Sequence, residues 1–241
     1  MNQILHGDCL ELMKDIPDKS IDMILCDLPY GTTACKWDTI IPFEPLWEQY
    51  KRIIKDNGAI VLTASQPFTS ALVMSNSEWF RHEIIWNKTR PSNVLNAKKM
   101  FMKYHENILI FYKKLPIFNP QMTQGKPFFK KDVAKRKLGS VYGKTGEKLG
   151  VEHINNGFRF PNTVLRISND NHNSFHPTQK PVALFEYLIK TYTNEGDLIL
   201  DNCAGSGTTG IAARNLNRNF ILIEKEQEYI DIINKRLDSN V

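Results

Sequence analysis

An apolar run leads directly into a glycine-rich turn at residues 198–210, Leu198-Ile199-Leu200-Asp201-Asn202-Cys203-Ala204-Gly205-Ser206-Gly207-Thr208-Thr209-Gly210. A helical pattern follows as far as Leu216, so the stretch predicts a strand, a turn and the start of a helix. Glycines in such a turn let the backbone approach a ligand closely, and the helix N-terminus adds the positive end of its dipole. We therefore expect this turn to contact a bound ligand.

The kind of ligand stays open from this turn alone. Residues 205–210 match the dinucleotide pattern G-x-G-x-x-G, which unrelated proteins also match, and the lysine of a phosphate-binding P-loop is missing. The next apolar run, residues 220–223, ends in Glu224, and an acid at this place can bind a ribose diol. A nicotinamide enzyme and an enzyme with an adenosyl cofactor both fit these residues.

Apolar runs and helical spacing alternate along most of the remaining chain, whereas residues 114–175 lack clear periodicity and predict loops with short elements. Strands alternating with helices indicate a mainly parallel sheet covered on both faces. A chain of 241 residues suits one large α/β domain with an inserted region. The expected strands are residues 4–5, 21–26, 59–63, 83–86, 107–112, 198–200 and 220–223, and the expected helices include residues 9–16, 43–54, 67–75 and 182–192.

A second stretch with chemical potential is Asp27-Leu28-Pro29-Tyr30, which follows the expected strand at residues 21–26. The acid can accept hydrogen bonds from an amino group, and the proline restricts the turn and removes a competing N–H. The tyrosine offers a flat face on which a base can stack. Turns after strands also favour Asp and Pro, so the stretch is ambiguous by itself.

A third stretch, His176-Pro177-Thr178-Gln179-Lys180-Pro181, precedes the expected helix at residues 182–192. Pro181 suits the start of that helix, which explains part of the segment. A nicotinamide enzyme needs neither this segment nor the turn at Asp27.

Acids recur where the expected strands end. In open α/β sheets the ligand crevice lies outside the carboxyl ends of the strands. One acid there is more often a helix N-cap, but four beside a glycine-rich turn favour a site. The four acids are Asp8, Asp27, Asp201 and Glu224.

The net charge of +5 conceals an asymmetry along the chain. Residues 88–148 contain 15 Lys and Arg against three acids, a net charge of +12, whereas the remainder carries −7. The basic residues are interspersed with aromatic residues, as in surfaces that bind nucleic-acid phosphates, although a solvated basic face is the simpler explanation. The composition is that of a soluble globular protein, and no charged leader or membrane-length apolar run is seen, so we expect a cytoplasmic location. Four cysteines without C-x-x-C spacing predict no metal site.

Taken in their order along the chain, 27–30, 176–181 and 198–210, the three stretches resemble the motifs of the amino-group DNA methyltransferases of the β arrangement. In that arrangement the catalytic half precedes the cofactor-binding half. The resemblance extends from Gly7 to Leu237. It implies a Rossmann-like methyltransferase sheet, mainly parallel and circularly permuted, with an inserted basic target-recognition region. The implied parts are a catalytic half (1–113), a target-recognition region (114–175) and a cofactor-binding half (176–241). Leu28 replaces the usual proline of the catalytic turn, where a main-chain carbonyl acts, and Cys203 stands where an aromatic residue is common.

The resemblance also implies S-adenosylmethionine as the cofactor and assigns site residues. The expected catalytic residues are Asp27, Leu28, Pro29 and Tyr30. The expected cofactor-binding residues are Asp8, Thr178, Lys180, Asp201, Cys203, Ala204, Gly205, Ser206, Gly207, Thr208 and Glu224. From the basic segment, the expected DNA-binding residues are Lys88, Arg90, Lys98, Lys99, Lys130, Lys131, Lys135, Arg136 and Lys137.

The expected activity is methylation of the exocyclic amine of adenine in double-stranded DNA after base flipping. An aspartate at the first position of the catalytic turn, Asp27, goes with adenine in this family, and serine with cytosine. A cytosine-N4 enzyme, an RNA methyltransferase and an NAD-binding oxidoreductase are the alternatives. A homodimer and a cognate restriction enzyme are the expected protein partners.

Overall fold

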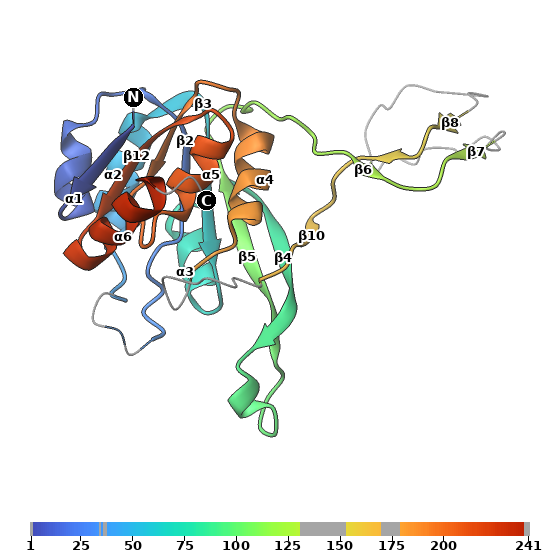
Figure 1. Cartoon of the computed structure of the whole chain (residues 1–241), viewed down its shortest axis with the longest axis horizontal. Coiled ribbons are helices and arrows are strands. Elements are labelled where there is room, and N and C mark those ends of the chain that lie inside the picture. The colour runs from blue at the N-terminus through green and yellow to red at the C-terminus, as the bar shows by residue number, and fades with distance from the viewer. Residues whose placement is uncertain (1, 34, 36–37, 131–152, 170–178, 239–241) are drawn as a thin grey trace. The chain divides into compact units, whose positions relative to one another are not determined.

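The computed structural model describes residues 2–33, 35, 38–130, 153–169 and 179–238. The chain forms two compact units, one of residues 1–119 and 162–241 and the other of residues 120–161. The larger unit contains an eight-stranded sheet in the order β1-β12-β11-β2-β3-β5-β4-β10 (Figure 1). Its strands are β1 (Gln3–His6), β2 (Ile21–Cys26), β3 (Ile54–Ala64), β4 (Phe80–Ser92), β5 (Lys103–Phe111), β10 (Val164–Arg166), β11 (Leu198–Asp201) and β12 (Asn219–Glu224).

Parallel pairing dominates the sheet. The neighbours from β1 through β12, β11 and β2 to β3 are all parallel, and β10 is parallel to β4. Only β5 runs antiparallel to its neighbours, β3 and β4, among these paired strands. The predicted mainly parallel α/β fold is thereby confirmed, while the circular permutation and the domain boundaries stay predictions.

Helices cover both faces of the sheet, as the alternating pattern predicts. The first core packs α1, α2 and α3 against one face, and the second packs α4, α5 and α6 against the other (Figure 1). The helices are α1 (Cys9–Leu12), α2 (Phe43–Ile53), α3 (Phe68–Ser75), α4 (Val182–Tyr192), α5 (Thr208–Asn215) and α6 (Gln227–Asp238), with 3₁₀ turns η1 (Met13–Asp15) and η2 (Val94–Asn96).

The central strand β2 shows why the sheet needs both layers. Side chains alternate across a strand, so Ile24 and Cys26 enter the first core while Met23 and Leu25 enter the second. A strand that is buried on both faces is nearly continuously apolar, as parallel strands between helical layers are. The turn that follows β2 is therefore held by a rigid part of the fold.

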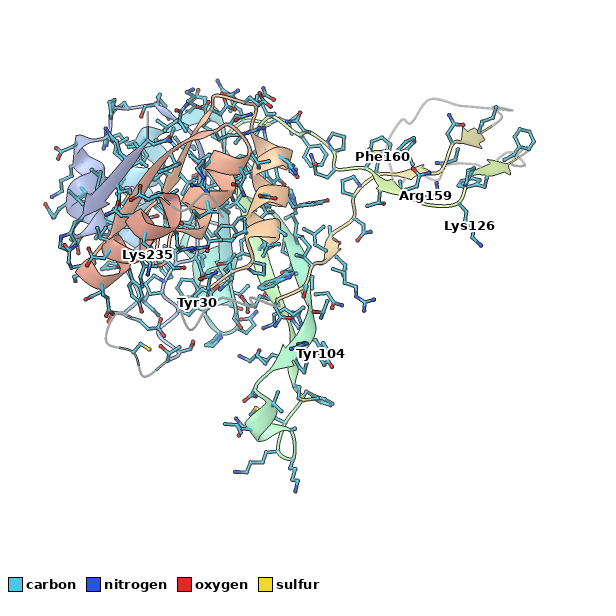
Figure 2. The ribbon with its side chains drawn as sticks, viewed as in Figure 1. Tyr30, Tyr104, Lys126, Arg159, Phe160 and Lys235 are labelled. Atoms are coloured by element: carbon cyan, nitrogen blue, oxygen red, sulfur yellow. The ribbon has the colours of Figure 1, made fainter. Side chains whose placement is uncertain are left out.

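The edge of the sheet at β4 and β5 differs from the sequence prediction. Strands are predicted at residues 83–86 and 107–112, but β4 continues to Ser92 and β5 begins at Lys103. These polar ends form a hairpin that extends beyond the sheet, with Tyr104 on it (Figures 1 and 2). Strand β10, in the region predicted as loops with short elements, joins the sheet, because pairing with β4 stabilises a strand too short to show periodicity.

The smaller unit contains two antiparallel strand pairs, β6 with β9 and β7 with β8. Arg159 donates to the carbonyl of Lys126 (2.6 Å), and both residues are labelled in Figure 2. Across the described part of the chain, no helix combines the length and apolarity needed to span a membrane. The strands are β6 (Thr123–Gln124), β7 (Phe128–Lys130), β8 (His153–Asn155) and β9 (Phe158–Arg159).

Candidate active site

One cavity of about 790 Å³ in the larger unit receives residues from all three predicted stretches. Small-molecule sites commonly have about 300–1,000 Å³, so this cavity can hold a nucleoside-sized ligand. The four acids predicted at the strand ends all line it, because β1, β2, β11 and β12 are neighbouring parallel strands whose carboxyl ends share one edge. Its lining includes Asp8, Asp27, Leu28, Pro29, Tyr30, Lys88, Glu106, Gln179, Lys180, Asp201, Cys203, Ala204, Gly205, Ser206, Thr208 and Glu224.

The carboxylate of Asp27 is held by three side chains. Its Oδ1 accepts hydrogen bonds from the hydroxyl groups of Tyr30 (2.7 Å) and Thr63, and its Oδ2 accepts one from Lys180 Nζ (2.7 Å). The Tyr30 ring stacks on Phe68 with centroids 5.2 Å apart, and Lys180 Nζ lies 5.5 Å from the Tyr30 centroid. The turn at Asp27 thus presents an oriented carboxylate beside the aromatic ring of Tyr30, which is labelled in Figure 2.

A buried aspartate secures the loop after this turn. The carboxylate of Asp38 accepts the backbone N–H groups of Gly31 (2.8 Å), Thr32 (2.9 Å) and Thr33 (2.6 Å). Burial alone would raise the pKa of Asp38, but these hydrogen bonds hold it below its usual value. Sequence analysis missed Asp38, although an acid shortly after a turn is a recognisable partner for the turn's N–H groups.

Glu224 is the acid whose surroundings fit a ribose diol. Its Oε2 accepts the N–H of Gly205 (2.7 Å), and its Oε1 accepts the N–H groups of Lys225 (2.8 Å) and Glu226 (2.9 Å). Two carboxylate oxygens offer about four acceptor positions, so these three bonds leave room for a ligand hydroxyl. Burial raises the pKa of Glu224 in spite of the hydrogen bonds.

Asp201 is bound mainly to its own loop. Its Oδ1 accepts the N–H of Cys203 (3.1 Å), and its Oδ2 accepts the hydroxyl of Thr209. It is 2% exposed, and this burial raises its pKa to about 6, in spite of those hydrogen bonds. The carboxylate therefore titrates near neutral pH at the wall of the cavity.

Gly207 has a structural role of its own, and its predicted contact with the cofactor stays a prediction. It does not appear in the cavity wall, whereas its neighbours Ser206 and Thr208 do. Its φ is +80°, and a Cβ added there would lie 2.9 Å from Ile233 Cγ1 on α6. A left-handed backbone and the packing against α6 each favour glycine at this position, apart from any approach to a ligand.

Lys88, a predicted DNA-binding residue, lies in a buried ion pair, and its contact with DNA stays a prediction. It is 5% exposed, and its Nζ lies 3.0 Å from Glu106 Oε1. The second oxygen, Glu106 Oε2, lies 3.4 Å from Lys180 Nζ. Burial alone would raise the pKa of Glu106, but the two ammonium groups hold it below its usual value. Sequence analysis missed Glu106. The available signal was Lys88, which continues the alternating buried positions Ile84 and Trp86 of β4, because a buried lysine needs an acidic partner.

The remaining predicted DNA-binding residues fall into two groups. Arg90, Lys98 and Lys99 are exposed on the β4–β5 hairpin, and Lys130 ends β7. The other predicted positions lie outside the described residues: Lys131, Lys135, Arg136 and Lys137, together with the cofactor residue Thr178.

Comparison with known proteins is consistent across sequence and structure. A DNA methylase family model matches residues 21–235. Type II methyltransferase M.HinfI of Haemophilus influenzae is 31% identical to this chain over 273 residues, covering 98% of the chain and 68% of that protein. Type II methyltransferase M.BglII of Bacillus subtilis is 32% identical over 261 residues, covering 96% and 68%.

Two solved structures extend the comparison to the fold. The crystal structure of the M1.HpyAVI–SAM complex has a TM-score of 0.66 and 26% identity, covering 99% of this chain and 100% of that one. The PvuII DNA methyltransferase, described as cytosine-N4-specific, has a TM-score of 0.71 and 18% identity, covering 100% and 88%. The PvuII likeness therefore concerns the fold alone.

Proposed function

The chain belongs to the N6/N4 DNA methylase family, and from this membership we propose that it methylates the exocyclic amine of adenine in double-stranded DNA after base flipping. The observation that carries the proposal is the single cavity shared by the glycine-rich loop and the Asp27 turn. A cofactor bound by the loop and a base bound by the turn would meet in that space.

S-adenosylmethionine is the cofactor of this family, and the residues of the cavity fit it. Glu224 offers a remaining acceptor position to the ribose hydroxyls, and Asp8 and Asp201 provide carboxylates in the same wall. Asp201 would attract the methionine ammonium group, and Lys180 would lie near the pocket. No Walker-type lysine follows the loop, which suits a cofactor without a phosphate.

The catalytic turn would position the target amine rather than act as a strong base. An exocyclic amine is a weak nucleophile because its lone pair is delocalised into the ring. Asp27 and the carbonyl of Leu28 would accept its two N–H bonds and direct the nitrogen lone pair to the methyl group. When bound, the cofactor would supply a methyl group activated by its sulfonium, whose C–S electrons would stay on sulfur as the new N–C bond forms. The amine held by Asp27 and Leu28 would lose a proton to water.

Base flipping would bring the amine to this turn. Extruding a base costs a few kcal/mol, and stacking on an aromatic ring returns about 1–3 kcal/mol per base. Among the described residues, Phe68 stacks on the Tyr30 ring and Lys180 Nζ lies over it, so we assign the target base to the side where Lys180 lies.

DNA would be held by basic residues on the hairpin and in the predicted target-recognition region (114–175). Exposed lysines beside aromatic side chains suit phosphates and neighbouring bases. Lys98 and Lys99 are both exposed, and Tyr104 is 46% exposed on the same hairpin. A homodimer, a cognate restriction enzyme and a cytoplasmic location complete the proposal.

Adenine is proposed because Asp27 occupies the first position of the catalytic turn. The N4 amine of cytosine needs the same hydrogen-bond acceptors as the N6 amine of adenine, so cytosine is the alternative. Sequencing DNA from cells that express the protein, with detection of modified bases, tests both. We expect N6-methyladenine at one short sequence and none with Asp27→Ala. Detection of N4-methylcytosine would instead identify cytosine as the target base. Unmodified DNA in cells whose protein is folded and binds S-adenosylmethionine would contradict the proposal.

A further inference from the structure

The ammonium group of Lys180 lies where the proposed function needs the target amine. Its Nζ donates to Asp27 Oδ2 at 2.7 Å, and it lies 5.5 Å from the Tyr30 ring centroid. Under the proposed function, which this inference rests on, the flipped base would require the same carboxylate and the same aromatic ring. Lys180 is 8% exposed, so it is part of the cavity wall rather than a surface side chain.

The other oxygen of Asp27 does not offer the amine an easier route. Asp27 Oδ1 already accepts from Tyr30 and Thr63, and both donors are fixed on the fold. Thr63 is fully buried in β3, and Tyr30 is stacked on Phe68. Lys180 is the long, flexible donor of the three, so an arriving amine would displace it first.

Glu106 provides a second acceptor for the displaced ammonium group. Its Oε1 is bound to Lys88 at 3.0 Å, whereas its Oε2 lies 3.4 Å from Lys180 Nζ. Within the described part of the chain, Glu106 Oε2 is one of two buried side-chain atoms without a hydrogen-bond partner. A buried acceptor in this state favours any nearby donor that can reach it. A short movement of Lys180 would satisfy Glu106 Oε2 and release Asp27 Oδ2.

We propose that Lys180 is a positioning residue that occupies the amine site of Asp27 in the absence of DNA and moves to Glu106 Oε2 when the target base arrives. Asp27 Oδ2 then has a donor both with and without the base, and an acceptor without a donor in such a site is unfavourable. The ammonium charge also leaves the nitrogen that becomes more positive during methyl transfer. Lys88 keeps Glu106 oriented throughout through its other oxygen.

The charges around Lys180 are consistent with this exchange. Among the described residues, the charged side chains paired with Lys180 are Asp27 and Glu106, and Lys88 is paired with Glu106. Burial alone would lower the pKa of Lys180, but the two carboxylates raise it. Lys180 is therefore protonated where it lies, and the proposed exchange moves a hydrogen bond and requires no proton transfer.

Single-turnover methylation at saturating DNA and S-adenosylmethionine tests the exchange. Glu106→Gln keeps an acceptor for Lys88 but removes the charge that receives Lys180, so the rate should fall about tenfold or more, as for loss of a charge-assisted hydrogen bond. Adding Lys180→Met to this variant frees Asp27, so the double variant should be faster than Glu106→Gln alone. Glu44→Gln, on the exposed start of α2, is the matched control and should leave the rate unchanged.

A second pair of variants keeps Glu106 intact, in case Glu106→Gln does not fold. Arginine at position 180 keeps the charge, but its planar fork can hold Asp27 firmly. Lys180→Arg should therefore be slower than Lys180→Met, the reverse of the order for a residue that only supplies charge. A double variant no faster than Glu106→Gln, or Lys180→Arg at least as fast as Lys180→Met, would overturn the exchange. Absence of methyl transfer in the wild type would instead contradict the proposed function.

Discussion

Alanine at position 207 should destabilise the protein through two separable effects. Gly207 has φ +80°, and a non-glycine residue in the left-handed region costs about 1–2 kcal/mol. The added Cβ would also lie 2.9 Å from Ile233 Cγ1 and 3.2 Å from Ile233 Cγ2, and overpacking of this kind costs about 1–3 kcal/mol. The expected loss in the free energy of unfolding is therefore about 2–5 kcal/mol.

Gly196 supplies a matched control for the backbone effect. Its φ is +84°, and a Cβ there would meet nothing within 4 Å. Gly196→Ala should cost only the backbone term of about 1–2 kcal/mol. Both substitutions restrict the unfolded chain equally, so the difference between them isolates the contact with Ile233.

Urea unfolding, followed by circular dichroism, measures both losses. In an Ile233→Ala background the γ carbons are absent, so Gly207→Ala should then cost about as much as Gly196→Ala. Equal losses for Gly207→Ala and Gly196→Ala in the wild-type background would refute the contact with Ile233. So would a Gly207→Ala loss that Ile233→Ala leaves unchanged.

Three further predictions concern the site. Tyr30→Phe keeps the stacking face but loses the hydroxyl that orients the Asp27 carboxylate, so its methylation rate should lie between those of wild type and Tyr30→Ala. With 2-aminopurine at the target position, only Tyr30→Ala should give bright emission. If Tyr30→Phe is as inactive as Tyr30→Ala, stacking does not explain the role of Tyr30. Burial raises the pKa of Asp201 to about 6, so S-adenosylmethionine should bind about tenfold more weakly at pH 5 than at pH 7, as measured by calorimetry. If Asp201→Asn shows the same pH dependence, Asp201 is not its cause. Replacing Lys98 and Lys99 by Ala should reduce the salt slope of DNA binding by up to about two, unlike the charge-matched replacement of Lys113 and Lys114.

The sign of the Asp201 effect follows from linkage. Its folded pKa of about 6 lies above the ordinary 3.8, so the folded protein holds the proton more tightly than the unfolded chain. Asp201 thus favours folding below its unfolded pKa, and that contribution is lost as the pH rises from 3.8 towards 6. A bound ammonium group reverses the preference by stabilising the ionised carboxylate, so cofactor binding should improve over the same pH range.

Local sequence predicts those parts of the site that depend on one strand and its following turn. The acids Asp27, Asp201 and Glu224 could be placed because parallel strands bring their carboxyl ends to one edge. The strands themselves were readable as apolar runs, since burial on both faces leaves little room for polar residues. No knowledge of strand order was needed for this step.

Residues whose position depends on strand register could not be placed in the same way. Thr63 reaches Asp27 because β2 pairs in parallel with β3, with Cys26 opposite Leu62. Glu106 is placed by the antiparallel pairing of β3 with β5, with Thr63 opposite Ile108. A shift of one residue in this pairing would turn Glu106 to the opposite face of the sheet. Register is fixed by contacts distant in the sequence, so an acid within an expected strand carries no local sign of a site.

The adjacency of β2 and β11 explains how stretches far apart in the sequence form one cavity. Met23 pairs with Ile199, and Ile24 with Leu200, so the turn after β2 and the loop after β11 leave the sheet side by side. Neighbouring strands lie about 4.7–4.9 Å apart, which brings a carboxylate and a glycine-rich loop within reach of one ligand pair. The shared cavity depends on this pairing of strands and not on the order of the two stretches along the chain.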